Sequence, residues 1–380
     1  GAAGTMTAMS PATLTIDLGA IAHNTAVMKR VAGEAKLMCV VKADAYNHGA
    51  QRVIPAMEDA GADAFGVATL AEAARIRQLT DKPVLAWIWQ PGEEIPEGIE
   101  VGVPGLEHLR WLVNHNVKRP VHLIVDTGLN RSGIDEEDWP QAFDLATATG
   151  LEVRGLMSHF ACADEPTHPY NQVQRDAFQR AITLARAHGL EVPVNHLANS
   201  PGTLTGAENA FGMVRPGIAL YGLNPVEGTG ADATAGPGAE LQPAMTLSAG
   251  LTAVKRISKG EGASYSLTWT APEDGWTAIV PMGYADGIPR AWQDHIEVTI
   301  GGRRYPQVGR VCMDQFIVWL GADRAGINVG DQAVIFGGGG MSAAELARRV
   351  GTIHYEVVCA PGGRVVREYV DKQESHEATV

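Results

Sequence analysis

Between residues 37 and 222, short apolar runs of strand length alternate with segments whose apolar residues recur at helical spacing. The helical segments include Leu70 to Leu79, Gly105 to Asn114 and Asn171 to Ala187. Strands that alternate with helices in this way are typical of a (β/α)8 barrel of the TIM type, although a doubly wound sheet would give the same pattern strand by strand. We predict the barrel, an α/β fold. Its strands are Leu37 to Val41, Phe65 to Ala68, Val84 to Trp89, Ile99 to Val103, Val121 to Val125, Val153 to Ser158, Val194 to Leu197 and Met213 to Arg215.

The pattern changes after Gly222. Residues 224–238 are rich in Gly, Pro, Thr and Ala and predict a linker. Beyond them a single helix, Ala343 to Val350 with Ser342 as its N-cap, interrupts a series of strand-like runs. We therefore predict the barrel over 10–235 and a mainly β domain over 236–380, with the first strand, 12–17, as a candidate to pair with the second domain. Residues 1–9 are interpreted as a cloning remnant. The strand-like runs are Met245 to Arg256, Trp276 to Pro281, Ile296 to Ile300, Phe316 to Leu320 and Ala333 to Phe336.

Charge and cysteine usage exclude several classes of function. The 380 residues include 30 basic and 43 acidic side chains, a net charge of −13 that disfavours nucleic acid and anionic membranes as partners. The four cysteines are scattered without a CxxC pair, so we expect neither a metal site nor a disulfide framework. No apolar stretch approaches the roughly 20 residues that span a bilayer. These features favour a cytoplasmic protein.

The first predicted strand ends at a lysine. Residues 37–41 are apolar and deliver Lys42, which Asp44 and Tyr46 follow within a turn. Burial lowers the pKa of a lysine from roughly 10.4 and makes its amine nucleophilic, as a Schiff base requires. From position alone, however, a lysine whose amine reaches out of a strand end into solvent is the simpler interpretation.

Residues 41–49 (VKADAYNHG) resemble the pyridoxal-phosphate lysine motif of the alanine racemase family, and this resemblance decides in favour of the reactive lysine. Further segments match the family in the same order, and together they cover nearly the whole chain. The resemblance implies a barrel that binds pyridoxal 5′-phosphate, followed by a β domain. The matching segments are 125–133, 158–160, 195–200, 213–222, 264–265, 283–287, 308–314 and 352–356.

Racemisation removes the α-proton from one face of an amino acid and returns a proton to the other, so two bases must flank the cofactor. By resemblance, Lys42 carries the cofactor as an aldimine and serves one face, while Tyr265 of the partner subunit serves the other. A tyrosine near pKa 10 needs a stabilised phenolate, for which His159 and Arg215 are candidates. Arg215 is also expected at the pyridine nitrogen, where a permanent cation limits delocalisation into the ring.

The resemblance also assigns the binding residues. Arg131 would hold the substrate carboxylate through its planar guanidinium, assisted by the backbone N–H of Met313. Because Tyr265, Tyr284, Met313 and Asp314 act in the partner's site in this family, a head-to-tail homodimer is implied. The cofactor-binding set is Lys42, Tyr46, His159, Asn199, Ser200, Arg215, Gly217, Ile218 and Tyr355; the supporting or substrate-access positions are Asp164, His196, Tyr284, Arg290, Arg310, Asp314 and Ile353.

The chain departs from the common family pattern at Ile124, where many members have a lysine that becomes carbamylated and braces the arginine. We expect an inorganic anion such as chloride, or another side chain, beside Arg131 instead. The predicted reaction is the interconversion of L- and D-alanine, which supplies D-alanine for peptidoglycan. The alternatives are a broad-specificity or serine racemase and a non-catalytic pyridoxal-phosphate carrier. A barrel-type decarboxylase is disfavoured, because it would pair the pyridine nitrogen with an acid where Arg215 stands.

Overall fold

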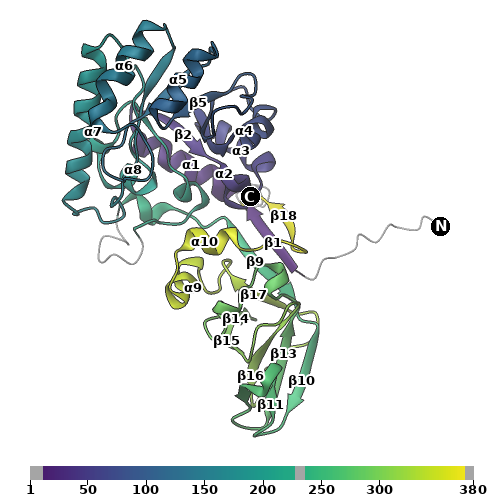
Figure 1. Cartoon of the computed structure of the whole chain (residues 1–380). Helices are drawn as coiled ribbons and strands as arrows, with labels where there is room; N and C mark the ends of the chain where they lie inside the picture. Colours follow the sequence, from purple (N-terminus) through teal and green to yellow (C-terminus); the bar gives the residue numbers. More distant parts are fainter. Residues whose placement is uncertain (1–11, 227–235, 373–380) are drawn as a thin grey trace, which may run out of the picture. The chain divides into compact units, whose positions relative to one another are not determined.

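The computed structural model describes residues 12–226 and 236–372 and divides into two compact units. Residues 18–242 form one unit, here called the barrel unit; residues 12–17 together with those after 242 form the other, the β unit (Figure 1). The boundary falls after Gln242 rather than at 235, because buried Asn24 exchanges two hydrogen bonds of 2.8 Å with the backbone of Gln242. The predicted remnant at 1–9 and part of the predicted linker lie outside the described residues.

A seven-stranded parallel sheet forms the barrel wall, in the order β7-β6-β5-β4-β3-β2-β8. His196 makes parallel bridges to Met157 at one edge of this sheet and to Met213 at the other, so its segment takes the place of an eighth strand and closes the barrel. The α/β barrel prediction is thus confirmed. The strands are β2 (Lys36–Val40), β3 (Ala64–Thr69), β4 (Val84–Ile88), β5 (Glu100–Val103), β6 (Val121–Ile124), β7 (Val153–Met157) and β8 (Met213–Val214).

The predicted strand at 194–197 is the one barrel strand that is not regular. Only the His196 bridges join it to the neighbouring strands in a sheet pattern, and Val192 just before it has a φ of 38°. A Cβ on Gly155 would lie 1.5 Å from the carbonyl oxygen of Val194, so the segment approaches β7 closely enough to require glycine there. The apolar run therefore predicted the position of this segment in the barrel but not its irregular backbone.

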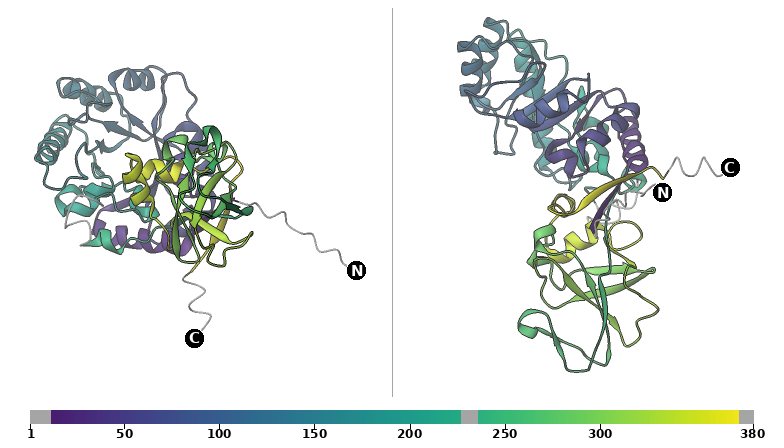
Figure 2. Two further views of the ribbon diagram at one scale, coloured as in Figure 1. Left: turned by 90° about the horizontal axis from the view of Figure 1, so that it is seen from below. Right: turned by 90° about the vertical axis from the view of Figure 1, so that its right-hand side faces the viewer.

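Helices surround the strands on the outside of the barrel (Figure 2). α4 shows why one of them begins where it does: the Thr69 side chain accepts from the Glu72 backbone N–H while Glu72 accepts from Thr69, a capping box. Inside the ring, the apolar side chains of Met38, Leu85 and Met157 pack together. The helices are α1 (Leu18–Ala32), α3 (Ala50–Asp59), α4 (Leu70–Arg77), α5 (Leu106–Asn114), α6 (Trp139–Ala148), α7 (Tyr170–Ala187) and α8 (Ser200–Thr205).

The β unit is built on a nine-stranded sheet, in the order β10-β13-β16-β15-β14-β17-β9-β1-β18. Its strand β1 comes from the start of the chain and pairs antiparallel with β9 and parallel with β18. The sheet strands are β1 (Ala12–Asp17), β9 (Met245–Gly250), β10 (Ala253–Ile257), β13 (Gly275–Val280), β14 (Glu297–Ile300), β15 (Arg303–Val308), β16 (Phe316–Gly321), β17 (Gln332–Phe336) and β18 (Val366–Val370); the helices are α9 (Ala343–Val350) and α10 (His354–Cys359).

Two details of this unit differ from the sequence prediction. The run from Met245 to Arg256 is two strands, because the chain leaves one strand at Gly250 and enters the next at Ala253. A second helix, α10, follows α9, although only one was predicted. Among the described residues, none of the helices combines the length and apolar character needed to cross a bilayer.

Candidate active site

The chain after Lys42 turns with the opposite hand to an ordinary helix. Residues 43–47 all have φ between 52° and 68°, and the backbone N–H of Asn47 donates to the Ala43 carbonyl at 2.9 Å. Left-handed helical geometry costs roughly 1–2 kcal/mol for each residue with a Cβ. Carboxylates hold the turn at both ends, since Glu72 accepts from the Ala43 N–H at 2.6 Å and Asp44 accepts from the Ala50 N–H at 2.9 Å. A strained, braced turn, α2 (Lys42–Tyr46), thus fixes the backbone at Lys42.

Arg215 is a buried cation that is bound entirely by neutral acceptors. Its Nη1 donates to the Nδ1 and the carbonyl oxygen of His196 at 2.7 and 3.0 Å, and its Nη2 donates to the Ser158 carbonyl at 2.6 Å and to His159 Nδ1 at 3.2 Å. No carboxylate of the described residues forms an ion pair with it. Burial and the nearby Arg131 lower the pKa of Arg215 from its usual value to about 9. An unpaired buried cation of this kind favours an anionic or electron-rich ligand.

Two histidines beside Arg215 are held neutral. Burial, then the charges of Arg215, Arg131 and Lys42, lower the pKa of His159 to about 3. Burial and the charge of Arg215 also lower the pKa of His196 well below its usual value. The structure therefore brings Lys42, Arg131 and Arg215 into one region of positive potential around His159.

The residues expected at the phosphate lie around Ser200, whose hydroxyl accepts from the backbone N–H groups of Gly217 and Ala219 at 3.0 and 3.1 Å. A Cβ on Gly217 would lie 2.2 Å from the Tyr46 hydroxyl oxygen, so only glycine leaves room for that hydroxyl. The Ser200 hydroxyl accepts from both N–H groups and still has its own proton to donate, so this small, polar region beside a glycine fits a phosphate group. Asn199 caps α8 by accepting from the Gly202 N–H at 3.0 Å.

Arg131 lies on a loop that glycines and one aspartate shape. Asp126 accepts from the backbone N–H groups of Gly128 and Asn130 at 2.9 and 3.2 Å. A Cβ on Gly128 would lie 2.1 Å from the Tyr170 hydroxyl, which closes the loop from α7. Within residues 12–226 and 236–372, we find no hydrogen bond or ion pair of the Arg131 guanidinium itself. The guanidinium is exposed and available for a carboxylate.

Ile124 belongs to the apolar interior of the barrel. It packs with Met38, Leu85 and Met157, and a Cβ on Gly102 would lie 2.9 Å from the Ile124 Cδ1 atom. The side chain cannot hydrogen bond, so Ile124 itself cannot brace the Arg131 guanidinium.

Tyr265 lies in the β unit, on a strained loop, with its side chain 70% exposed. The residues on either side have left-handed backbone, with φ of 68° at Ser264 and 63° at Ser266. Ser264 donates from its hydroxyl to the Arg310 carbonyl at 3.1 Å. An exposed aromatic residue held by a strained and anchored loop is presented to a ligand or a partner rather than packed into a core.

Further exposed side chains of the β unit lie on two loops that are joined by hydrogen bonds. The backbone N–H of Tyr284 donates to the Cys312 carbonyl at 3.0 Å, so the Tyr284 turn lies directly against the segment that carries Met313. Arg364 fixes both loops, because it binds buried Asp286 at 2.8 and 2.9 Å and Asp314 at 2.9 Å. Tyr284 and Met313 are about half exposed.

The remaining predicted positions separate into two groups. Ile218, buried, and Asp164, exposed, lie in the barrel unit, whereas Arg290, Arg310, Ile353 and Tyr355 lie in the β unit. His196 is fully buried and bonded to Arg215, which fits a supporting contact.

The sequence reasoning missed several supporting residues. Tyr221 stacks on Tyr46 at a centroid distance of 4.8 Å and donates to the Val40 carbonyl at 2.8 Å. Glu72 braces the turn after Lys42 in addition to capping α4. The capping box of Glu72 was readable as Thr-x-x-Glu, but its second contact joins segments 29 residues apart and had no sequence signal.

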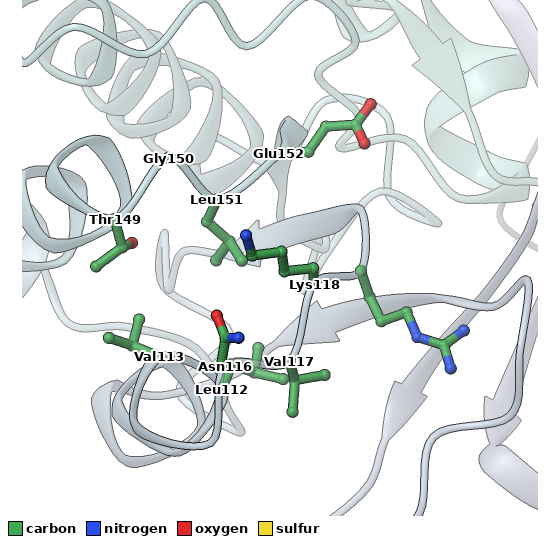
Figure 3. Close-up of a pocket in the computed structure, with 10 residues that line it drawn as sticks. Leu112, Val113, Asn116, Val117, Lys118, Thr149, Gly150, Leu151 and Glu152 are labelled. Atoms are coloured by element: carbon green, nitrogen blue, oxygen red, sulfur yellow. The ribbon is translucent and has the colours of Figure 1, made fainter.

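Two features outside this region are not part of the site. Cys162, Glu165 and His168 lie close enough together to hold a metal ion. His168 Nδ1, however, accepts from the Tyr170 N–H at 3.1 Å, so the proton of the neutral imidazole is on Nε2 and neither nitrogen has a lone pair left for a metal. A surface hollow lined by Leu112, Lys118 and Glu152 precedes β6 and β7 (Figure 3). It therefore lies at the N-terminal ends of the strands, where barrel active sites are not found.

Comparison with known proteins agrees with this geometry. Residues 16–225 match the family model "Alanine racemase, N-terminal domain" and residues 244–369 match "Alanine racemase, C-terminal domain". An alanine racemase of Corynebacterium efficiens is 53% identical over 370 residues, which are 95% of this chain and 99% of the relative. The crystal structure of alanine racemase from Corynebacterium glutamicum is similar with a TM-score of 0.85 at 48% identity, covering 95% of this chain and 100% of that one.

A third similar structure is described with its cofactor. It is the alanine racemase from Bartonella henselae with covalently bound pyridoxal phosphate, at a TM-score of 0.85 and 26% identity, covering 95% of this chain and 100% of that one. Because both family models match and the relatives align over nearly the full length, this chain belongs to the alanine racemase family.

Proposed function

We propose that this chain is an isomerase that interconverts L- and D-alanine with pyridoxal 5′-phosphate and thereby supplies D-alanine for peptidoglycan. The observation that carries the proposal is the buried Arg215, which has no carboxylate partner among the described residues and lies in the same region as Lys42 and Arg131. Relatives up to 53% identical over nearly the whole chain are alanine racemases. No observation favours a serine-preferring racemase or a non-catalytic carrier.

The residues around Lys42 fit the cofactor. Lys42 would bind it through Nζ, the region of Ser200, Gly217 and Tyr46 would receive the phosphate, and Arg215 would face the pyridine nitrogen. When bound, pyridoxal phosphate accepts the electron pair that remains on Cα after the α-proton is removed. The cation of Arg215 limits how far this charge spreads into the ring, which suppresses side reactions such as transamination.

The protein's own groups then move the protons. Arg131 binds the substrate carboxylate and thereby orients the Cα–H bond towards a base. The Lys42 amine takes or returns the proton on one face and the Tyr265 hydroxyl on the other. His159 stays neutral beside Arg215, so it can accept a hydrogen bond without adding a second charge.

We propose a head-to-tail homodimer as the working form, with Tyr265, Tyr284, Met313 and Asp314 completing the site of the partner subunit. Tyr265 and Met313 are exposed although they are large and apolar, and each is held on an anchored loop. This is the pattern of side chains that a second copy covers. Tyr355, Arg290, Arg310 and Ile353 are assigned to the cofactor and the access route on family resemblance.

We further propose that chloride or a similar inorganic anion, or another side chain, braces Arg131 in place of a carbamylated lysine. Ile124 offers no hydrogen bond, and the guanidinium has no partner among the described residues. Halide-dependent kinetics test the anion version: the KM for alanine should fall as chloride is added at constant ionic strength. A KM that is insensitive to halide would leave another side chain as the brace.

A cytoplasmic location is part of the proposal. The four cysteines, all within the described residues, form no disulfide, as expected in a reducing compartment.

The decisive experiment assays the purified protein against a panel of L- and D-amino acids by circular dichroism in deuterated water. Racemisation of alanine with deuterium incorporated at Cα is expected from both enantiomers. Lys42→Ala should lose both the activity and the visible absorbance of the bound cofactor, whereas Tyr265→Ala should lose racemisation and keep the cofactor. Full racemisation by Tyr265→Ala would contradict the two-base assignment.

A further inference from the structure

A chain of buried polar side chains continues from Arg215 through the inside of the barrel. Arg215 Nη1 lies 2.7 Å from His196 Nδ1, His196 Nε2 lies 2.8 Å from His122 Nδ1, and His122 Nε2 lies 2.8 Å from a carboxylate oxygen of Glu100. His122 and His196 are buried, and the Glu100 side chain is only 12% exposed. The chain thus joins the proposed cofactor region to the N-terminal end of β5, where Glu100 begins the strand.

The two ends of this chain fix the direction of every hydrogen bond in it. Arginine can only donate, so His196 Nδ1 must accept and its proton lies on Nε2. His196 Nε2 then donates to His122 Nδ1, which places the His122 proton on Nε2, facing Glu100. Glu100, as a carboxylate, can only accept. The requirements from the two ends agree, so the chain is fully satisfied with both imidazoles neutral.

The hydrogen-bonded series from Arg215 to Glu100 also offsets part of the cost of burying the Arg215 charge. A buried guanidinium without a carboxylate partner is costly, yet Arg215 is bound only by neutral groups. The charge of Glu100 polarises both imidazoles in the same direction and makes His196 Nδ1 a stronger acceptor for Arg215. On the far side, Arg154 lies 3.9 Å from the Glu100 carboxylate and 3.5 Å from the carboxylate of Glu152, and Glu152 lines the hollow in Figure 3.

We propose that His122 and Glu100 are positioning residues for Arg215: through His196 they hold its guanidinium in place and support its charge at the cofactor ring. The proposal rests on the proposed function for the role of Arg215, whereas the chain itself is a property of the folded protein. Neither residue touches the substrate or the cofactor in this assignment. Their effect on the reaction passes through Arg215.

The test compares Glu100→Gln with Asp144→Asn in the full-length protein. Gln keeps the size of Glu100 and can still accept from His122, but it removes the charge. Asp144 is the matched control, because its carboxylate also accepts from an imidazole, His188 Nδ1 at 2.6 Å, and the Asp144 side chain is 67% exposed. Glu100→Gln should lower kcat about tenfold and leave the KM for alanine nearly unchanged, while Asp144→Asn should change neither.

Nitrogen-15 NMR of the histidines gives a readout that does not depend on activity, both with and without cofactor. In the unmodified protein, His122 and His196 should both carry their proton on Nε2, and Glu100→Gln should shift the His122 Nε2 proton towards that of a weaker hydrogen bond. A proton on His196 Nδ1 in the unmodified protein would contradict the assigned hydrogen-bond directions, and this result does not require the variant to fold. Equal kcat and unchanged histidine signals in Glu100→Gln would overturn the positioning role.

The two readouts also separate this proposal from the proposed function. If the unmodified protein exchanges no α-proton of alanine, the proposed function is wrong, while the NMR result still decides whether the hydrogen bonds from Arg215 to Glu100 form as assigned. If the unmodified protein racemises alanine and Glu100→Gln behaves like Asp144→Asn, only the positioning role fails.

Discussion

At the scale of single residues, His159 links the electrostatics of the site to stability. Its imidazole is held neutral by burial and three cations, which lower its pKa to about 3. In the unfolded chain the same group takes up a proton near pH 6.5. The pKa is lower in the folded state, so this contribution to stability is complete above about pH 6.5 and is lost as the pH falls towards about 3.

We expect His159→Gln to flatten this pH dependence. The free energy of unfolding of the unmodified protein should fall more steeply below pH 6.5, by about 1.4 kcal/mol per pH unit for this group. Urea titrations at a series of pH values measure the slope. His115→Gln, which removes an exposed imidazole at the end of α5, is the control for the loss of one histidine. Parallel slopes for His159→Gln and the unmodified protein would refute the assignment.

Which single residues the sequence could predict depends on how local their roles are. Lys42, Arg131 and Arg215 stand in segments that match the family, and the charges of all three act on His159. His122 and Glu100 had no such signal, because their roles depend on contacts across 74 and 22 positions of the chain. The sequence placed His196 among the supporting or access positions, but it gave no sign of the contact to Arg215, which lies 19 positions away along the chain.

At the scale of elements, the left-handed turn after Lys42 stores strain that a substitution can release. Ala43 is exposed and has a φ of 52°, a conformation that glycine adopts without a Cβ penalty. We expect Ala43→Gly to raise the free energy of unfolding by up to about 1 kcal/mol, because the relieved strain exceeds the extra entropy of the unfolded chain. Thermal unfolding measures the change.

Ala74→Gly is the matched control for this prediction. Ala74 lies within the right-handed helix α4, where the same change should destabilise the protein by about 1 kcal/mol. Opposite signs for one chemical change would establish that the turn is left-handed in solution. A loss of stability in both variants would contradict the proposal that the left-handed backbone at Ala43 is strained. No sequence pattern predicted this turn, because alanine and tyrosine give no signal for left-handed backbone, and aspartate and asparagine adopt it as single residues rather than in a run.

At the scale of the whole molecule, the sequence predicted both architectures but not the path of the chain through them. The alternation of strands and helices gave the barrel, and the change of texture after Gly222 gave the β unit. The barrel unit ends at Gln242 rather than at residue 235, because Gln242 hydrogen bonds to Asn24 of α1. The net charge of −13 likewise describes the chain as a whole, whereas three cations act on His159 inside the barrel unit.

The proposed dimer makes a prediction for the whole molecule. If each site combines Lys42 of one subunit with Tyr265 of the other, a mixed dimer of Lys42→Ala and Tyr265→Ala chains contains one site with both bases and one with neither. Random assortment makes half of the dimers mixed, so co-refolding equal amounts of the two inactive variants should restore about a quarter of the unmodified activity.

A second mixture supplies the control for this experiment. Lys42→Ala and Arg215→Ala both change the barrel unit, so every barrel in their mixed dimer carries one defect and no activity should return. Recovery only in the first mixture establishes that the two bases come from different chains. If the first mixture stays inactive although mixed dimers form, as mass spectrometry of differently tagged chains would reveal, then each site takes both bases from one chain and the head-to-tail arrangement is wrong.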